Sequence, residues 1–278
     1  MRLPRALVET WSHEPAWLDA LPQLVADCAE QWSLELEPPV DTPHSLVIPA
    51  QEVVLKLNAP SHREADREAD ALERWDGRGA VQLVARDDER RGLLLERCRP
   101  GTCLWDTDED EDEDEVVVMS KLIPRLQVDV VGEHPFVLLA DEAIRWAESV
   151  PRWYAEAGHP FERSLLDAAL DVYRTVDRSA TRLVNQDLHG GNILRAKRER
   201  WLAIDPKPLV GEREVEASGL LRNTDDVSRW LDALVDLGFD RERARGWGVA
   251  HNLAWAWDER EGWSEQHVEE ARRILSAR

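Results

Sequence analysis

The chain has 278 residues, 43% of them hydrophobic, which is enough for a large buried core and for two lobes. Its formal net charge of −21 argues against nucleic acid as a partner, because phosphates would be repelled. The same charge would steer a cationic small molecule toward the protein, although solubility explains it equally well.

The N-terminal stretch up to residue 21 contains Pro4, Glu9 and Asp19, so it lacks the apolar core of a signal peptide. No apolar run approaches the roughly 20 residues that cross a bilayer. Cys28, Cys98 and Cys103 lack the spacing of a metal site, which favours reduced thiols. We therefore expect a cytoplasmic protein without membrane contact.

The N-terminal part predicts a helix followed by strands. Apolar residues recur at three- and four-residue steps over 14–32, and Pro15 suits the first turn of that helix. Strands are expected over 34–39, 44–49 and 52–57, separated by proline-containing turns. The loop 40–45 has no glycine, so we assign no phosphate site to it.

Lys56 lies within an apolar strand, where a lysine is rare unless it is paired or at the strand's end. The helix expected over 63–75 places Glu68 on its apolar stripe, with Glu64 one turn earlier. We predict that Glu68 pairs with Lys56, and Glu64 is the alternative. Strands over 80–85 and 92–96 follow, and the second leads into a segment that contains Cys98.

An acidic run over 106–115 is typical of a solvated segment, with attraction of a polycationic substrate as the less favoured alternative. Helical patterns then cover 116–125, 141–155 and 161–176. Near the C-terminus, 209–223 reads as irregular, and helices are expected over 225–237, 240–259 and 264–275. Ser264 is the predicted N-cap of the last helix, and His251 is interpreted as a core histidine.

The most informative stretch is 183–194, followed by 201–208. It reads as a strand, a polar loop, a second strand and a third strand that ends at Asp205. Asp187, Asn192 and Asp205 have the spacing of a kinase catalytic loop and its metal ligands. Phosphoryl transfer needs a carboxylate that orients the acceptor oxygen, together with Mg²⁺, which prefers oxygen ligands. Gly190 and Gly191 would let the loop fold back on itself.

The segment Asp187-Leu188-His189-Gly190-Gly191-Asn192 resembles the D-x-H-x-x-N loop of the aminoglycoside phosphotransferase superfamily. Residues 204–212 and Leu220-Leu221-Arg222-Asn223 resemble its streptomycin 6-phosphotransferase and hydroxyurea phosphotransferase branch. One departure is Asn185-Gln186, where that superfamily usually has His-Gly before the catalytic aspartate.

The resemblance implies an α+β, bilobal, protein-kinase-like fold with the active site between the lobes. Residues 1–97 would form an N-lobe with a small antiparallel sheet and one key helix. Residues 98–278 would form the hinge and a mainly helical C-lobe, with the catalytic loop and the acceptor site.

The resemblance also implies an ATP- and Mg²⁺-dependent kinase that phosphorylates a hydroxyl of a small, cationic acceptor such as streptomycin. Hydroxyurea, another metabolite, and a catalytically weak nucleotide-binding homologue are the alternatives. A protein kinase is disfavoured, because the glycine-rich loop and the activation segment are missing.

Several residues receive roles from the same resemblance. Lys56 would hold phosphates and Glu68 would orient it, Asp187 would accept the acceptor's proton, and Asn192 and Asp205 would bind Mg²⁺. Adenine would meet backbone groups near Glu96 and Cys98. His189 would tie the loop together, and Lys207 would either touch phosphate or pair with an acid. The acids that could bind the acceptor, chosen by location, are Glu216, Asp225, Asp226, Asp258 and Glu259.

Overall fold

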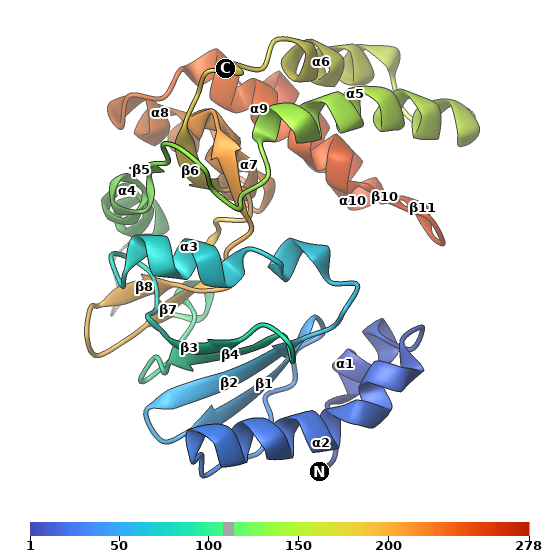
Figure 1. The fold of residues 1–278 in the computed structure, drawn as a ribbon. Helices are drawn as coiled ribbons and strands as arrows, with labels where there is room; N and C mark the ends of the chain where they lie inside the picture. Colours follow the sequence, from blue (N-terminus) through green and yellow to red (C-terminus); the bar gives the residue numbers. More distant parts are fainter. Residues whose placement is uncertain (108–113, 278) are drawn as a thin grey trace. The chain divides into compact units, whose positions relative to one another are not determined.

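The computed structural model describes residues 1–107 and 114–277, which form two compact units (Figure 1). Unit 1 comprises Met1–Thr102 and Leu194–Asp205, and unit 2 comprises Cys103–Ile193 and Pro206–Arg278. Most of the predicted acidic run, 108–113, lies outside the described residues.

The sequence-based division placed everything after residue 97 in the C-terminal lobe, whereas 98–102 and 194–205 pack within unit 1. Backbone pairing is the reason. The Gly101 N–H donates to the Arg195 carbonyl at 3.0 Å, and the Arg195 N–H donates to the Thr102 carbonyl at 2.9 Å.

Unit 1 is built around an antiparallel sheet of strand order β1-β2-β4-β3. The strands of this sheet are β1 (Ser45–Ala50), β2 (Val53–Asn58), β3 (Leu83–Asp87) and β4 (Gly92–Glu96). A separate pair is formed by β7 (Ile193–Arg195) and β8 (Trp201–Ala203). Its helices are α1 (Arg5–Thr10), α2 (Pro15–Trp32), the 3₁₀ turn η1 (Arg63–Ala65) and α3 (Glu68–Trp75).

Two predictions need correction here. Residues 34–39 form no strand and contribute one isolated bridge, between Leu36 and Ala50, because Pro38 and Pro39 lack the N–H groups that a strand donates. The helix expected over 63–75 is confirmed from Glu68 onward, and its first turn is the separate 3₁₀ turn η1.

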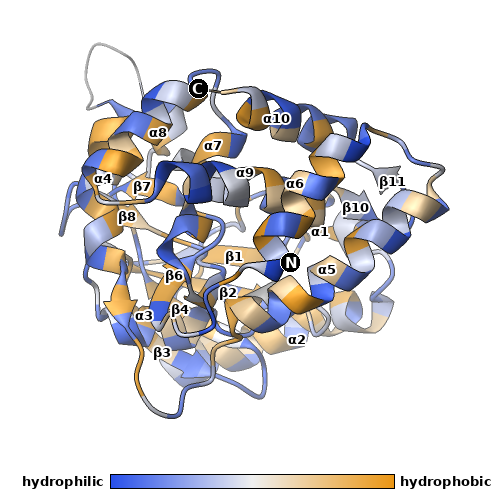
Figure 2. Cartoon of the chain, turned by 90° about the horizontal axis from the view of Figure 1, so that it is seen from above, coloured by the Kyte–Doolittle hydropathy of each residue, from blue (hydrophilic) through white to orange (hydrophobic). Residues whose placement is uncertain are grey.

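The two faces of this sheet have different environments. Helix α2 lies on one face and α3 on the other (Figure 1). Leu55 and Leu57 belong to the apolar core shared with α2, and the apolar residues of β1 and β2 are orange in Figure 2. Because successive side chains of a strand point to opposite faces, Lys56 points toward the face covered by α3.

Unit 2 is mainly helical, with a small antiparallel sheet of order β5-β6-β9 and a hairpin, β10-β11. Its helices are η2 (Leu104–Asp106), α4 (Glu115–Leu126), α5 (Leu139–Glu156), α6 (Arg163–Arg174), η3 (Gly190–Asn192), η4 (Arg213–Glu216), α7 (Ala217–Arg222), α8 (Val227–Asp236), α9 (Arg241–Trp255) and α10 (Glu265–Ser276). Its strands are β5 (Val128–Asp129), β6 (Arg182–Asn185), β9 (Pro208–Gly211), β10 (Trp257–Asp258) and β11 (Gly262–Trp263).

Helix α9 lies at the centre of unit 2 and packs against α6, α7 and α10. The predicted helices that match α4, α5, α6, α8 and α10 are confirmed, as is the Ser264 cap, which accepts from the His267 N–H. Helix α9 ends at Trp255, where the β10-β11 hairpin replaces the expected continuation to residue 259.

The expectation of an irregular segment over 209–223 was wrong. Residues 208–211 form β9, which pairs with β6 and is buried throughout, and α7 follows. The pairing partner of β9 is distant in sequence, so the local residue pattern did not reveal this strand.

The α+β class is confirmed by the antiparallel sheet of unit 1 and the helices of unit 2. Across the residues that the structure describes, no helix is both long enough and apolar enough to traverse a membrane.

Candidate active site

The predicted catalytic loop follows β6 in unit 2 and is fixed at its start by Asn185. The side-chain oxygen of Asn185 accepts from the Asp187 N–H at 3.2 Å and from the Lys207 N–H at 3.0 Å. Asn185 therefore joins the loop to the segment that leads into β9, and it was not among the predicted site residues. Lys207 itself is buried, and its carbonyl accepts from the Gln186 N–H.

Asp187 forms an ion pair that the sequence did not predict. Its Oδ1 accepts from Arg222 Nη2 at 2.8 Å. Arg222 ends α7, is 7% exposed, and its guanidinium lies 4.8 Å from the centre of the Trp255 ring. The only sequence signal was the motif over 220–223, which suggested the family without giving Arg222 a role.

His189 and Asn192 hold the loop together from within. The imidazole Nδ1 of His189 accepts from the Gly191 N–H at 3.1 Å. The Asn192 amide nitrogen donates to the Asp187 carbonyl at 3.1 Å and lies 3.2 Å from His189 Nε2. Because that nitrogen is used inside the loop, the amide oxygen of Asn192 is the atom that remains to bind a metal.

The second half of the loop rests on Trp105 and Glu115. The Trp105 ring stacks on His189 with ring centres 4.8 Å apart. Glu115 Oε1 accepts from the Gly190 N–H and from Trp105 Nε1, each at 3.0 Å. Burial raises the pKa of Glu115, although these two hydrogen bonds favour its charged form.

The two loop glycines are required for a different reason from the one predicted. Neither is among the residues with a positive φ, so the loop does not depend on a left-handed backbone. A Cβ at Gly190 would lie 2.5 Å from Trp105 and from Glu115, and one at Gly191 would lie 2.8 Å from the Trp105 ring. Close packing of the neighbouring side chains therefore excludes any larger residue.

In unit 1, the structure brings Lys56, Glu68 and Asp205 together. Lys56 Nζ lies 2.7 Å from each Glu68 oxygen and 2.6 Å from Asp205 Oδ1. Lys56 is 6% exposed and Glu68 is 0% exposed. Burial alone would lower the pKa of Lys56, but the charges of Asp205 and Glu68 outweigh it and raise the pKa, so the ammonium stays charged.

Asp205 is the last residue of unit 1 and has a left-handed backbone, with φ of 48°. Aspartate is one of the few side chains that tolerate this conformation, which directs the chain away from β8. The side chain of Glu64, the alternative partner for Lys56, lies outside the part of the chain that the structure describes.

Of the predicted adenine contacts, Glu96 is the last residue of β4 and Cys98 lies two residues after it. The Glu96 N–H donates to the Gln82 carbonyl at 2.9 Å, so that donor is already used within the protein. The Glu96 carboxylate binds Arg198 at 2.8 Å. Burial raises the pKa of Cys98 to about 12, which keeps the thiol protonated and excludes it as a nucleophile.

The five predicted acceptor-binding acids are not gathered in one place. Glu216 is fully buried and accepts from the Asn185 N–H at 3.0 Å. Asp225 pairs with Arg273, and Asp226 caps α8. Asp258 accepts from backbone N–H groups in the β10-β11 turn, where Glu259 is exposed.

Taken separately, two predicted metal ligands have chemistry that fits Mg²⁺. Asp205 of unit 1 has a carboxylate and Asn192 of unit 2 has an amide oxygen, and both are hard oxygen ligands of the kind that this ion prefers. No cluster of three or more His, Cys, Asp or Glu able to hold a metal occurs in residues 1–107 and 114–277.

Comparisons with known proteins show the family of the chain. Residues 33–262 match the profile of the aminoglycoside/hydroxyurea antibiotic resistance kinases. A streptomycin 6-kinase of Streptomyces glaucescens is 34% identical over 267 residues, covering 89% of this chain and 86% of the relative. A hydroxyurea phosphotransferase of Kitasatospora aureofaciens is 35% identical over 253 residues, covering 86% and 74%.

Solved structures show the fold. A choline kinase of Streptococcus pneumoniae has a TM-score of 0.62 at 14% identity, covering 92% of this chain and 97% of that chain. A macrolide 2′-phosphotransferase of Brachybacterium faecium has a TM-score of 0.56 at 15% identity, covering 93% and 98%. The fold is therefore the protein-kinase-like fold that the sequence predicted.

Proposed function

This chain belongs to the aminoglycoside/hydroxyurea antibiotic resistance kinases, and on that premise we propose that it transfers the γ-phosphate of ATP to a hydroxyl of a streptomycin-like aminoglycoside. The observation that carries the proposal is the cluster in which the buried Lys56 contacts the buried Glu68 and the partly exposed Asp205. Burying the charges of Lys56 and Glu68 is costly, so such a cluster is expected where a charged ligand is handled.

The residues of unit 1 are assigned to the nucleotide. Lys56 binds the α- and β-phosphates of ATP, and Glu68 keeps its ammonium group in place through both carboxylate oxygens. Asp205 supplies an oxygen ligand for Mg²⁺. When bound, that ion neutralises charge on the phosphate oxygens.

The residues of unit 2 are assigned to the acceptor. Asp187 orients the acceptor hydroxyl and takes up its proton, while Arg222 fixes the carboxylate by donating to Oδ1. From the same loop, the amide oxygen of Asn192 would be available as an oxygen ligand for Mg²⁺.

The name and similarity of the streptomycin 6-kinase favour an aminoglycoside acceptor, and the net charge of −21 favours a cationic one. Hydroxyurea is the second candidate, because a hydroxyurea phosphotransferase is similar to an equal degree. Asn185 argues against a degenerate homologue. Although it stands where the superfamily usually has histidine, its side chain holds both Asp187 and Lys207.

The test is ADP formation by the full chain with Mg²⁺ and ATP, with streptomycin or hydroxyurea as acceptor. Asp187→Asn keeps an oxygen for Arg222 but removes the base, so we expect kcat to fall by about 100- to 10,000-fold. The control is Asp236→Asn, at an exposed position of α8.

Near-normal turnover of Asp187→Asn would remove Asp187 from the reaction. No acceptor-dependent ADP formation by the wild type would reject the proposed activity, and turnover with hydroxyurea alone would establish the second candidate in its place.

A further inference from the structure

A pocket of about 440 Å³ lies in unit 2 beside the catalytic loop. Its lining includes Trp105, Glu115, Arg222, Gln266, Glu270 and Arg273, and its size falls in the usual range of ligand pockets, roughly 300 to 1,000 Å³. Two of these residues contact the loop directly. Arg222 binds the Asp187 carboxylate, and Glu115 accepts from the Gly190 N–H.

The positive charges of this pocket are already paired within the protein. Arg222 Nη2 contacts Asp187 at 2.8 Å. Arg273 Nη1 contacts Asp225 at 3.2 Å, and its Nη2 donates to the Arg222 carbonyl at 2.9 Å. Each guanidinium group therefore already contacts a carboxylate of the same unit, although the buried Nε of Arg273 has no hydrogen-bond partner within the described residues.

The negative charges are not paired in this way. Glu115 accepts from the neutral Gly190 N–H and Trp105 indole. Glu270 is 8% exposed, its Oε1 accepts from Gln266 Nε2 at 2.9 Å, and its Oε2 has no hydrogen-bond partner in the residues that the structure describes. A buried carboxylate that lacks a cation is costly, so a ligand that brings positive charge would offset that cost.

We propose that this pocket binds the acceptor and that Glu270 selects acceptors that carry an amine or guanidinium group. The inference rests on the proposed phosphotransfer function and specifies the substrate class for it. The Trp105 indole, held by Glu115 and stacked on His189, adds an aromatic surface that a cationic group can contact.

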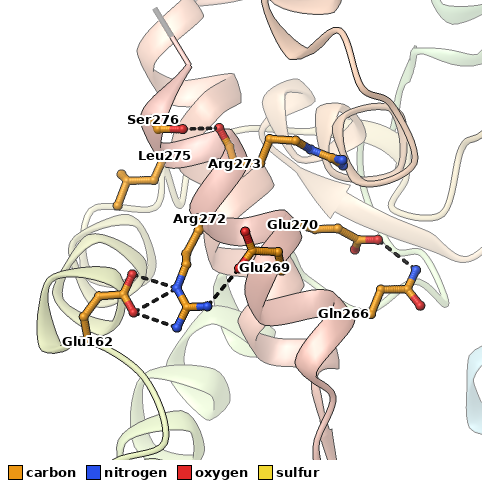
Figure 3. Close-up of a pocket in the computed structure, with 8 residues that line it drawn as sticks. All are labelled: Glu162, Gln266, Glu269, Glu270, Arg272, Arg273, Leu275 and Ser276. Atoms are coloured by element: carbon orange, nitrogen blue, oxygen red, sulfur yellow. Dashed lines mark hydrogen bonds and ion pairs between the residues drawn. The ribbon is translucent and has the colours of Figure 1, made fainter.

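Helix α10 offers a matched control for Glu270. Figure 3 shows Glu270, Gln266 and Arg273 on one side of α10, whereas Arg272 reaches Glu162 on the other. Glu269 pairs with Arg272 at 2.9 Å, is 72% exposed and does not line the pocket beside the loop. Glu270→Gln keeps an oxygen for Gln266, so we expect the fold to be retained.

The experiment measures binding and turnover of streptomycin, which carries guanidinium groups, by the full chain. Loss of a charged partner predicts that Glu270→Gln weakens streptomycin binding in calorimetry, and raises its KM, by about 10- to 100-fold. The kcat value should change little, because Glu270 does not contact the catalytic loop. Added salt should weaken binding by the wild type more than by Glu270→Gln, and Glu269→Gln should behave as the wild type.

Equal affinity of the wild type and Glu270→Gln for streptomycin would overturn the pocket assignment, as would absence of binding to the wild type. Binding that depends on Glu270 without ADP formation would reject the proposed phosphotransfer but support the pocket. ADP formation with an unchanged KM in Glu270→Gln would reject the pocket alone.

Discussion

We expect the buried Glu216 to make the protein less stable as the pH rises, and the substitution Glu216→Gln should remove this effect. The residue is fully buried beneath β6, where its Oε1 accepts from the Asn185 N–H at 3.0 Å and its Oε2 accepts from Gln127 Nε2. Burial raises the pKa of Glu216 from 4.5 to about 7, although both hydrogen bonds act in the opposite direction.

The sign follows from proton binding. Between pH 4.5 and 7 the folded chain holds a proton on Glu216 that the unfolded chain has released, so the free energy of unfolding falls as the pH rises. The contribution of protonated Glu216 to the free energy of unfolding is complete below pH 4.5 and is lost above pH 7. At about 1.4 kcal/mol per pH unit, this interval corresponds to about 3 kcal/mol.

Glu216→Gln remains neutral at every pH, so its stability relative to the wild type should rise by about 2 to 3 kcal/mol between pH 5 and pH 8. Urea unfolding followed by tryptophan fluorescence at pH 5, 6, 7 and 8 measures this difference. Glu214→Gln is the control, because Glu214 lies two positions earlier and is only half-buried. Parallel pH profiles for Glu216→Gln and the wild type would refute the reasoning.

Two further substitutions test how the catalytic loop is held. Asn185→Ala leaves the Asp187 and Lys207 N–H groups without their acceptor, so we expect a loss of about 2 kcal/mol or more in unfolding free energy and a lower kcat. Unchanged kcat in the ADP assay would show that Asn185 does not position Asp187. Gly219→Ala places a Cβ against the backbone carbonyl of Leu188, so a destabilisation of about 1 to 3 kcal/mol is expected, with reduced turnover. A wild-type melting temperature for this variant would contradict the close approach of α7 to the loop.

The pairing of Lys56 with Glu68 could be predicted because it depends on local periodicity. Side chains alternate along β2, so Lys56 lies on the opposite face of the strand from Leu55 and Leu57. The three- and four-residue spacing of α3 sets Glu68 on its buried face. Because β2 and α3 are close in sequence, these two faces can pack together without depending on distant segments. Lys56 Nζ and Glu68 Oε2 lie 2.7 Å apart.

The partners of the catalytic loop could not be predicted in this way. Arg222 reaches Asp187 because α7 packs under the loop, and Glu115 reaches Gly190 from the start of α4. Glu115 also closes an acidic run, where composition alone suggested solvated charge. Such contacts depend on the packing of distant elements, which local patterns do not specify.

By itself, the sequence predicted the chemistry, because the spacing of Asp187, Asn192 and Asp205 matches a kinase catalytic loop with its metal ligands, and Lys56 lies within an apolar strand. Only the tertiary structure decided which groups surround them. Pairing of β6 with the distant β9, packing of α7 under the loop and the approach of α10 to the pocket placed Arg222, Asn185 and Glu270 at the site. The physical reason is that hydrogen bonds, ion pairs and buried charges are formed by whichever side chains the fold brings within a few ångströms.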